Sequence, residues 1–248
     1  MDYYGTEIKG RLSPRIPHTT KLDEAWRVDL ARGLRQLALG DLERAEMHFG
    51  RAHKRAPDQP EVCFVLGRER LRQGRLPEAE RLLGAAWRKD PSFPAAAAGL
   101  ARCLGANPKR RAEAHRVLSE ASLLHPSEPG LHVVRAELHL EEGRLELARV
   151  AIDQALLLVG DDGDAPATRK AALAILARTY NSEGIGLGRA GQNDQALFAF
   201  KRAADLDPEW AGPIVNMGIA FAQLGRPARA RSCYERARSK DPENPVAL

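Results

Sequence analysis

Histidine is the first residue type in this chain that could hold a metal or move a proton. No two of the seven histidines stand four residues apart, the spacing that a zinc pair on one helix requires. His132 and His139 are seven residues apart and could share a helix face, but without an added carboxylate or thiolate we interpret them as interface or core residues. The full set is His18, His48, His53, His115, His125, His132 and His139.

Cysteine and clustered aspartate are the other residue types with potential chemistry. Cys63, Cys103 and Cys233 are few, odd in number and far apart, a pattern typical of reduced thiols, and we expect each to be a small buried apolar residue. The three aspartates of "GDDGDAP" (residues 160–166) lack the spacing and the terminal glutamate of a calcium loop. We interpret that stretch as a solvated turn.

The glycines of "GIGLG" (residues 184–188) are similar to part of a dinucleotide-binding fingerprint. They follow no strand and lie inside a predicted helix, so helix packing explains them better. The sequence has neither a nucleophile elbow nor a phosphate-binding loop. It therefore predicts a non-enzymatic protein with no cofactor and no metal.

Composition permits several kinds of partner without selecting one. The 248 residues are 44% hydrophobic, enough for a buried core, and the formal net charge is only +5. Of the 38 basic residues 30 are arginine, which together with abundant alanine weakly favours a GC-rich bacterial source. No signal peptide, acylatable N-terminal cysteine or long apolar run is seen, so we expect a cytoplasmic protein without a membrane span.

An internal repeat organises the elements that must position any functional side chain. Similar blocks end at Pro57, Pro91, Pro126, Gly160, Pro208 and Pro242, at intervals of 34, 35, 34, 48 and 34 residues. Periods of this length are typical of stacked helical repeats. The sequence therefore predicts six units.

Each block carries two alanines seven residues apart with a large residue between them. These spacings place the three on one helix face, where alanine allows a close neighbour and the large residue fills the gap. The large residues are Phe49, Leu83, Leu118, Ile152, Phe200 and Tyr234. The alanines are Ala45 and Ala52, Ala79 and Ala86, Ala114 and Ala121, Ala148 and Ala155, Ala196 and Ala203, and Ala230 and Ala237.

A first helix is predicted upstream of each block. We expect it to end in a left-handed glycine at Gly40, Gly74, Gly143, Gly191 or Gly225. Inside it stands another small residue, which indicates close helix packing: Gly33, Gly67, Ala101, Ala136, Gly184 or Gly218. The closing proline then ends the second helix.

This pattern resembles the tetratricopeptide repeat family over residues 26–242. The resemblance implies an all-α, right-handed superhelical solenoid of antiparallel helix pairs, whose first helices line a concave groove. In the first unit the register of the first helix stays open, because Asp29, Arg32 and Gln36 occupy apolar positions. About fourteen extra residues between the fourth and fifth units are interpreted as a loop and a lengthened first helix. The RNA-reading pentatricopeptide family fits the alanine, aromatic and proline positions less well.

The predicted organisation is an N-terminal extended arm, a solenoid and a short tail. The arm covers residues 1–24, the solenoid covers 25–242 and the tail covers 243–248. The units span approximately 25–58, 59–92, 93–127, 128–160, 165–209 and 210–243.

The family pattern places groove-facing positions on the first helices. In the second unit these are Glu61, Phe64, Arg68, Leu71 and Arg72; in the third Ala95, Ala98 and Arg102; in the fourth Val133, Glu137 and Glu141; in the fifth Arg178, Asn181, Ile185 and Arg189; and in the sixth Val215, Asn216, Ile219 and Gln223. Such a mixture suits an extended peptide or partner helix with some acidic character. The carboxylate clamp of chaperone-binding relatives is not matched in three successive units.

The chain ends six residues after Pro242. We therefore expect the surface around Ala230, Cys233, Tyr234 and Ala237 to be covered by a partner or a second copy. The predicted function is a non-enzymatic scaffold or adaptor that holds proteins in a larger, bacterial assembly. One alternative is an assembly factor for an envelope machine, resembling type IV pilus pilotins. The second is a nucleic-acid-binding repeat protein, which the charge makes the weaker prediction.

Overall fold

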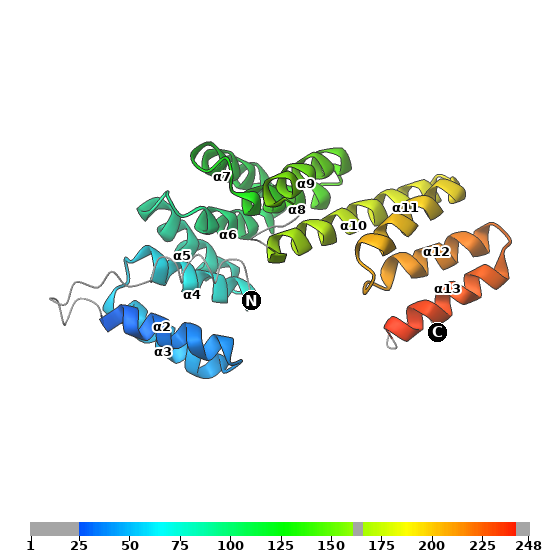
Figure 1. Cartoon of the computed structure of the whole chain (residues 1–248). Coiled ribbons are helices and arrows are strands. Elements are labelled where there is room, and N and C mark those ends of the chain that lie inside the picture. Colours follow the sequence, from blue (N-terminus) through cyan, green and yellow to red (C-terminus); the bar gives the residue numbers. More distant parts are fainter. Residues whose placement is uncertain (1–24, 161–165, 242–248) are drawn as a thin grey trace. The chain divides into compact units, whose positions relative to one another are not determined.

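The computed structural model describes residues 25–160 and 166–241, and it is built from helices (Figure 1). Within those two ranges no residue lies in a β-strand, which confirms the predicted all-α class. The predicted N-terminal arm and C-terminal tail lie outside the described residues. The α-helices are α2 (Ala25–Ala38), α3 (Leu42–Arg55), α4 (Pro60–Arg72), α5 (Leu76–Lys89), α6 (Pro94–Gly105), α7 (Arg111–Leu124), α8 (Pro129–Glu141), α9 (Leu145–Val159), α10 (Pro166–Arg189), α11 (Asn193–Leu206), α12 (Gly212–Gln223) and α13 (Pro227–Lys240).

The helices form pairs joined by short turns, as the repeat predicts. Helix α2 packs on α3, α4 on α5, α6 on α7 and α12 on α13. Successive pairs also pack on each other, since α5 contacts α6 and α11 contacts α12. In these pairs an amphipathic helix therefore buries its apolar face against its partner helix, and α5, α6, α11 and α12 also pack against a neighbouring pair.

The small residue inside each first helix accommodates the large residue of the second. A Cβ atom added to Gly184 would lie 2.5 Å from the Phe200 ring, and one added to Gly218 would overlap the Tyr234 ring. The same relation joins Gly33 to the Phe49 ring. Real Cβ contacts are not this short, so close packing explains these glycines, as expected.

The turn between α4 and α5 shows how the first helix of a repeat ends. Gly74 has a φ of 73°, in the left-handed region that favours glycine. The Arg75 amide donates to the Arg70 carbonyl at 2.8 Å and the Gly74 amide donates to the Leu71 carbonyl at 3.0 Å, the two bonds of a Schellman motif. All the turn glycines predicted from the sequence have positive φ: Gly40, Gly74, Gly143, Gly191 and Gly225.

Two departures from a regular repeat alter the helices locally. Helix α10 has 24 residues, whereas α12 has 12, which confirms the lengthened first helix of the fifth unit. At the turn of the third unit, Pro108–Arg110 forms a 3₁₀-helix, and the Asn107 side chain accepts a hydrogen bond from the Lys109 amide at 3.0 Å. Here a side-chain cap replaces the glycine of the other turns.

In α2 the structure resolves the register that the sequence left open. Leu30 is fully buried, and Asp29 beside it is buried as well. The Asp29 carboxylate lies 3.2 Å from the Arg55 guanidinium and 3.7 Å from His48 Nδ1, both on α3. A charged residue therefore occupies an apolar position because two basic groups of the paired helix face it.

Contacts within the chain divide it into two compact units, which are described separately. The first unit contains α2 to α7 and the start of α8, as far as Val134. The second begins at Arg135 and contains the rest of α8, α9, α10 from Thr168 onward, and α11 to α13.

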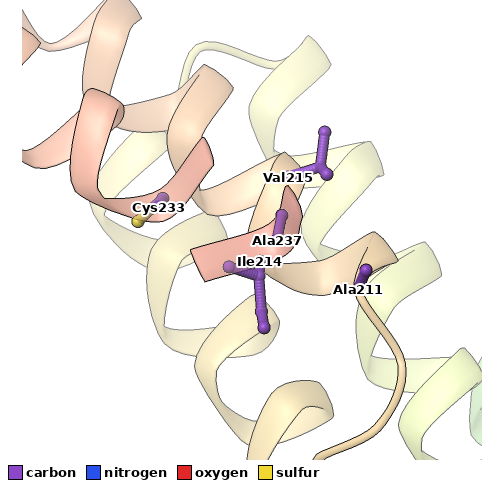
Figure 2. Packing of buried hydrophobic residues seen from close by; sticks show 5 residues of the cluster. All are labelled: Ala211, Ile214, Val215, Cys233 and Ala237. Atoms are coloured by element: carbon purple, nitrogen blue, oxygen red, sulfur yellow. The ribbon is translucent and has the colours of Figure 1, made fainter. Parts of the chain in front are cut away.

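The prediction that a partner covers the surface around Ala230, Cys233, Tyr234 and Ala237 of α13 is wrong. These residues pack in the core of the second compact unit. Cys233 and Ala237 pack with Ala211, Ile214 and Val215 of α12 and the segment before it (Figure 2). Ala230 is 4% exposed, and Tyr234 packs on the same cluster and against Gly218. Their three- and four-residue spacing defines the face that meets α12, the helix of the same unit, so it cannot also receive a partner.

The opposite face of α13 is polar. Its exposed residues are mainly charged: Arg229, Arg231, Glu235, Arg236, Arg238 and Lys240. This charged face of α13 therefore does not contribute to the apolar contacts with α12.

Candidate functional site

Two of the predicted groove residues, Asn181 and Asn216, contact each other directly in the second compact unit. The Asn216 side-chain amide on α12 donates a hydrogen bond to the Asn181 carbonyl oxygen on α10 at 2.8 Å. Asn181 is only 8% exposed, so this bond satisfies a polar group that would otherwise be buried without a partner. Because Asn216 is bound through its NH₂ group, its orientation is fixed and its own carbonyl oxygen has no partner among the described residues.

A pocket of about 210 Å³ lies beside this asparagine pair. Phe200 and Ala220 are its buried apolar residues, while Arg189 and Gln223 are exposed polar ones. Its complete lining is Ile185, Gly188, Arg189, Phe200, Asn216, Ile219, Ala220 and Gln223. We call this set the α10–α12 groove.

The groove offers three different interactions to a ligand. Ile219 is 39% exposed and presents an apolar side chain. Asn216 and Gln223 carry amide groups that can donate to and accept from a peptide backbone. Arg189 has no carboxylate partner within the described residues, so its guanidinium can bind a carboxylate in a forked geometry. This combination suits a polypeptide segment with an acidic residue.

The predicted groove residues of α4 are differently engaged. Arg72 lies 3.1 Å and Arg68 lies 3.6 Å from the Glu69 carboxylate of the same helix. Glu69 is 7% exposed, so its charge is compensated by these two arginines. They therefore contribute to the local structure of α4 before any partner binds.

Phe64 is a core residue, which corrects its assignment to the groove lining. It is 2% exposed, and its ring centroid lies 4.5 Å from that of Phe93. The segment leading into α6 covers the position that the family pattern leaves open. Glu61, Arg102 and Glu137 are half-buried on α4, α6 and α8 and do not line the α10–α12 groove.

The three thiols are buried and free, as the sequence predicts. Burial raises the pKa of Cys103 to about 11, and burial is also the main cause of the raised pKa of Cys63 and of Cys233. The reactive thiolate is therefore scarce at neutral pH. These environments suit structural cysteines and not nucleophiles.

Sequence reasoning missed the buried side of the groove. The sequence pattern marks Phe200 and Gly188 as packing residues and gives no role to Ala220, yet all three line the pocket. Their periodicity signals a core position, and only the placement of α10 against α12 reveals that one edge of this core is accessible.

Models of the tetratricopeptide repeat match most of the chain, over residues 36–103 and 189–248 and, with a second model, over residues 109–166. The chain belongs to the tetratricopeptide repeat family. These repeats bind protein partners or peptides, and the fold is that of a protein-protein interaction scaffold. No protein with a curated description matched the chain in sequence.

Solved structures share the repeat fold at low sequence identity. The type IV pilus biogenesis factor PilW is 16% identical, with a TM-score of 0.68, over 90% of this chain and 97% of PilW. Cut9, solved with Hcn1 from the APC/C, is 17% identical, with a TM-score of 0.67, over 99% of this chain. The chain spans only 44% of Cut9. The tetratricopeptide repeat protein TTC0263 from Thermus thermophilus is 22% identical over 80% of this chain and 100% of its own, with a TM-score of 0.55.

None of the described helices is long and apolar enough to cross a membrane.

Proposed function

We propose that this tetratricopeptide repeat protein is an adaptor that holds an extended peptide segment of a partner protein in the α10–α12 groove. The observation that carries the proposal is the hydrogen bond between Asn181 and Asn216. It fixes an amide group beside an apolar pocket, with an exposed arginine and an exposed glutamine along the same groove. Pre-positioned groups of this kind reduce the ordering cost of binding an extended chain.

A displayed library of random peptides, selected on the purified protein, tests this function. We expect enriched peptides to combine apolar residues with an acidic residue. The double substitution Arg189→Ala and Gln223→Ala should weaken binding of a selected peptide by about tenfold or more, since both side chains are exposed and removing them leaves the fold intact. Fluorescence anisotropy with a labelled peptide measures the change.

Glu235→Ala is the matched control, because Glu235 is exposed on the outer face of α13 and does not line the groove. The affinity of the Glu235→Ala variant for the selected peptide should equal that of the wild type. Peptides that bind the double variant as tightly as the wild type would show that this groove is not the binding surface.

The proposal extends to an adaptor that acts within a larger bacterial, cytoplasmic assembly. Arginine-rich composition supports the source, and a repeat scaffold with an accessible groove supports the role. The likeness to PilW is one of fold, so a role in assembling an envelope machine stays a prediction. Affinity that falls steeply with salt would instead favour the nucleic-acid alternative, because phosphate contacts release counterions.

A further inference from the structure

A second hollow lies in the same compact unit, and it shares no lining residue with the α10–α12 groove. It has a volume of about 460 Å³, and its lining residues belong to α9, α10 and α11. Phe198 of α11 is 65% exposed at this hollow. We call it the Phe198 pocket; its lining is Arg149, Tyr180, Glu183, Leu187, Asp194, Gln195, Phe198, Ala199 and Arg202.

Arginine and aromatic side chains are interleaved in this pocket. The Arg202 guanidinium carbon lies 5.2 Å from the Tyr180 ring centroid and 5.5 Å from that of Phe198. Arg202 Nη1 also donates a hydrogen bond to the Tyr180 hydroxyl at 3.1 Å. The Arg149 guanidinium carbon lies 5.8 Å from the same Tyr180 ring centroid. Ring contacts and the hydroxyl bond therefore hold Arg202 in place at the pocket.

Three of the four charged residues that line the pocket are ion-paired. Arg149 donates to Glu183 at 3.3 Å and to Glu146 at 3.0 Å, so it is compensated by two carboxylates. Asp194 lies 3.8 Å from Arg226, an exposed and weaker pair. Arg202 has no carboxylate partner among the described residues. Arg202 is therefore the charged residue of the lining that has no oppositely charged partner among the described residues.

We infer that the Phe198 pocket is a second docking site, which takes a partner protein segment carrying an acidic residue next to an apolar side chain. The carboxylate pairs with Arg202, whose planar guanidinium is held by Tyr180 and Phe198 and retains donors for a forked bond. The apolar side chain covers Phe198, Leu187 and Ala199. Exposed aromatic and arginine side chains that are already ordered are the residue types that dominate binding energy at protein interfaces.

Substitutions of Arg202 and Phe198 test this inference, and a control variant elsewhere on the surface makes the same change of charge as Arg202→Glu. Peptides are selected from a displayed random library on the groove-deficient protein, Arg189→Ala with Gln223→Ala, so that the groove does not dominate the selection. We expect an enriched motif with Asp or Glu beside an apolar residue. Arg202→Glu and Phe198→Ala should each weaken binding of the selected peptide by about tenfold or more. Anisotropy measures the affinity, and circular dichroism verifies that each variant keeps its helix content.

Arg231→Glu is the control for charge reversal, since Arg231 is exposed on α13 and does not line the pocket. It should change the affinity less than about twofold. The inference is overturned if no acidic and apolar motif is enriched, or if Arg202→Glu and Arg231→Glu weaken binding equally. It is also overturned if sedimentation shows a dimer that Arg202→Glu abolishes, because a second copy would then occupy the pocket.

The proposals for the α10–α12 groove and for the Phe198 pocket can be tested separately. A peptide selected on the groove-deficient protein should bind the wild type with the same affinity, and a groove peptide should bind Arg202→Glu as it binds the wild type. If a peptide selected on the groove-deficient protein binds the wild type with a different affinity, only the inference about the Phe198 pocket fails. Loss of groove binding in the Arg189→Ala and Gln223→Ala double variant does not affect the test of the Phe198 pocket.

Discussion

At the residue scale, the "GIGLG" stretch of α10 contains glycines with opposite roles. A Cβ on Gly184 would lie 2.5 Å from the Phe200 ring, whereas one on Gly186 would meet no atom within 4 Å. The first glycine is required by packing against α11. The second has no such role and only lowers helix propensity. Identical residues two positions apart therefore differ because one faces the paired helix and the other faces open space.

We expect Gly184→Ala to lower the free energy of unfolding by about 1–3 kcal/mol, because the ring must shift in a packed core. Gly186→Ala should raise it by about 0.5–1 kcal/mol, through better helix propensity. Urea denaturation followed by circular dichroism measures both. Equal effects of the two substitutions would contradict the packing assigned to α10 and α11.

At the element scale, the α2 and α3 pair is held by a buried charge in addition to apolar contacts. Asp29 on α2 is 5% exposed and faces Arg55 and His48 of α3. A carboxylate at this depth is tolerated because partners on α3 compensate it. The same contacts fix how far α2 is rotated about its axis, since Asp29 must point toward α3.

Asp29→Ala should lower the free energy of unfolding by about 1–3 kcal/mol, because the Arg55 guanidinium on α3 loses the buried carboxylate that it pairs with on α2. Combined with Arg55→Met, the loss should be smaller than the sum of the single effects, a coupling of about 0.5–1.5 kcal/mol. Glu43→Ala on the exposed surface of α3 is the control and should stay within about 0.5 kcal/mol of the wild type. Additive effects of Asp29→Ala and Arg55→Met would exclude the ion pair as a source of stability.

At the scale of the whole molecule, stability should be local. Repeat proteins are stabilised by each unit and its nearest neighbours, so a defect spreads a short distance along the array. The chain offers equivalent positions for this comparison in its two compact units. A Cβ on Gly218 would overlap the Tyr234 ring, and one on Gly67 would lie 2.7 Å from Leu83.

Gly218→Ala should speed amide hydrogen exchange in α12 and α13 by about tenfold or more while leaving α4 and α5 unchanged. Gly67→Ala should give the reverse pattern. Hydrogen exchange followed by mass spectrometry of peptic fragments resolves the two regions. If either substitution accelerates exchange equally in both, the chain unfolds as one cooperative body and the nearest-neighbour description does not apply.

Much of the fold can be predicted from the repeat alone. Spacing assigns Gly184 and Phe200 to packing and Gly191 to a turn, and each occupies its predicted place. The candidate site is predicted less well. Asn181, Arg189, Asn216 and Gln223 lie at or beside one groove, whereas Phe64 lies in the core.

The reason for this difference is physical. Helices, turns and helix pairs depend on residues a few positions apart, so their pattern is local and repeats along the chain. Accessibility depends on which other helices cover a side chain. Phe93 buries Phe64, and α12 buries the alanine and cysteine face of α13, although neither relation is visible in a single block.

The sequence by itself determined the helix pairs, their number and the residues that allow them to pack, because those features follow from spacing within one repeat. Only the tertiary structure decided which side chains remain available to a partner. Asn216 is oriented by Asn181 from the preceding unit, and Arg202 is held by Tyr180 from the neighbouring helix. Both surfaces arise where separate helices meet, so no single stretch of the chain encodes them.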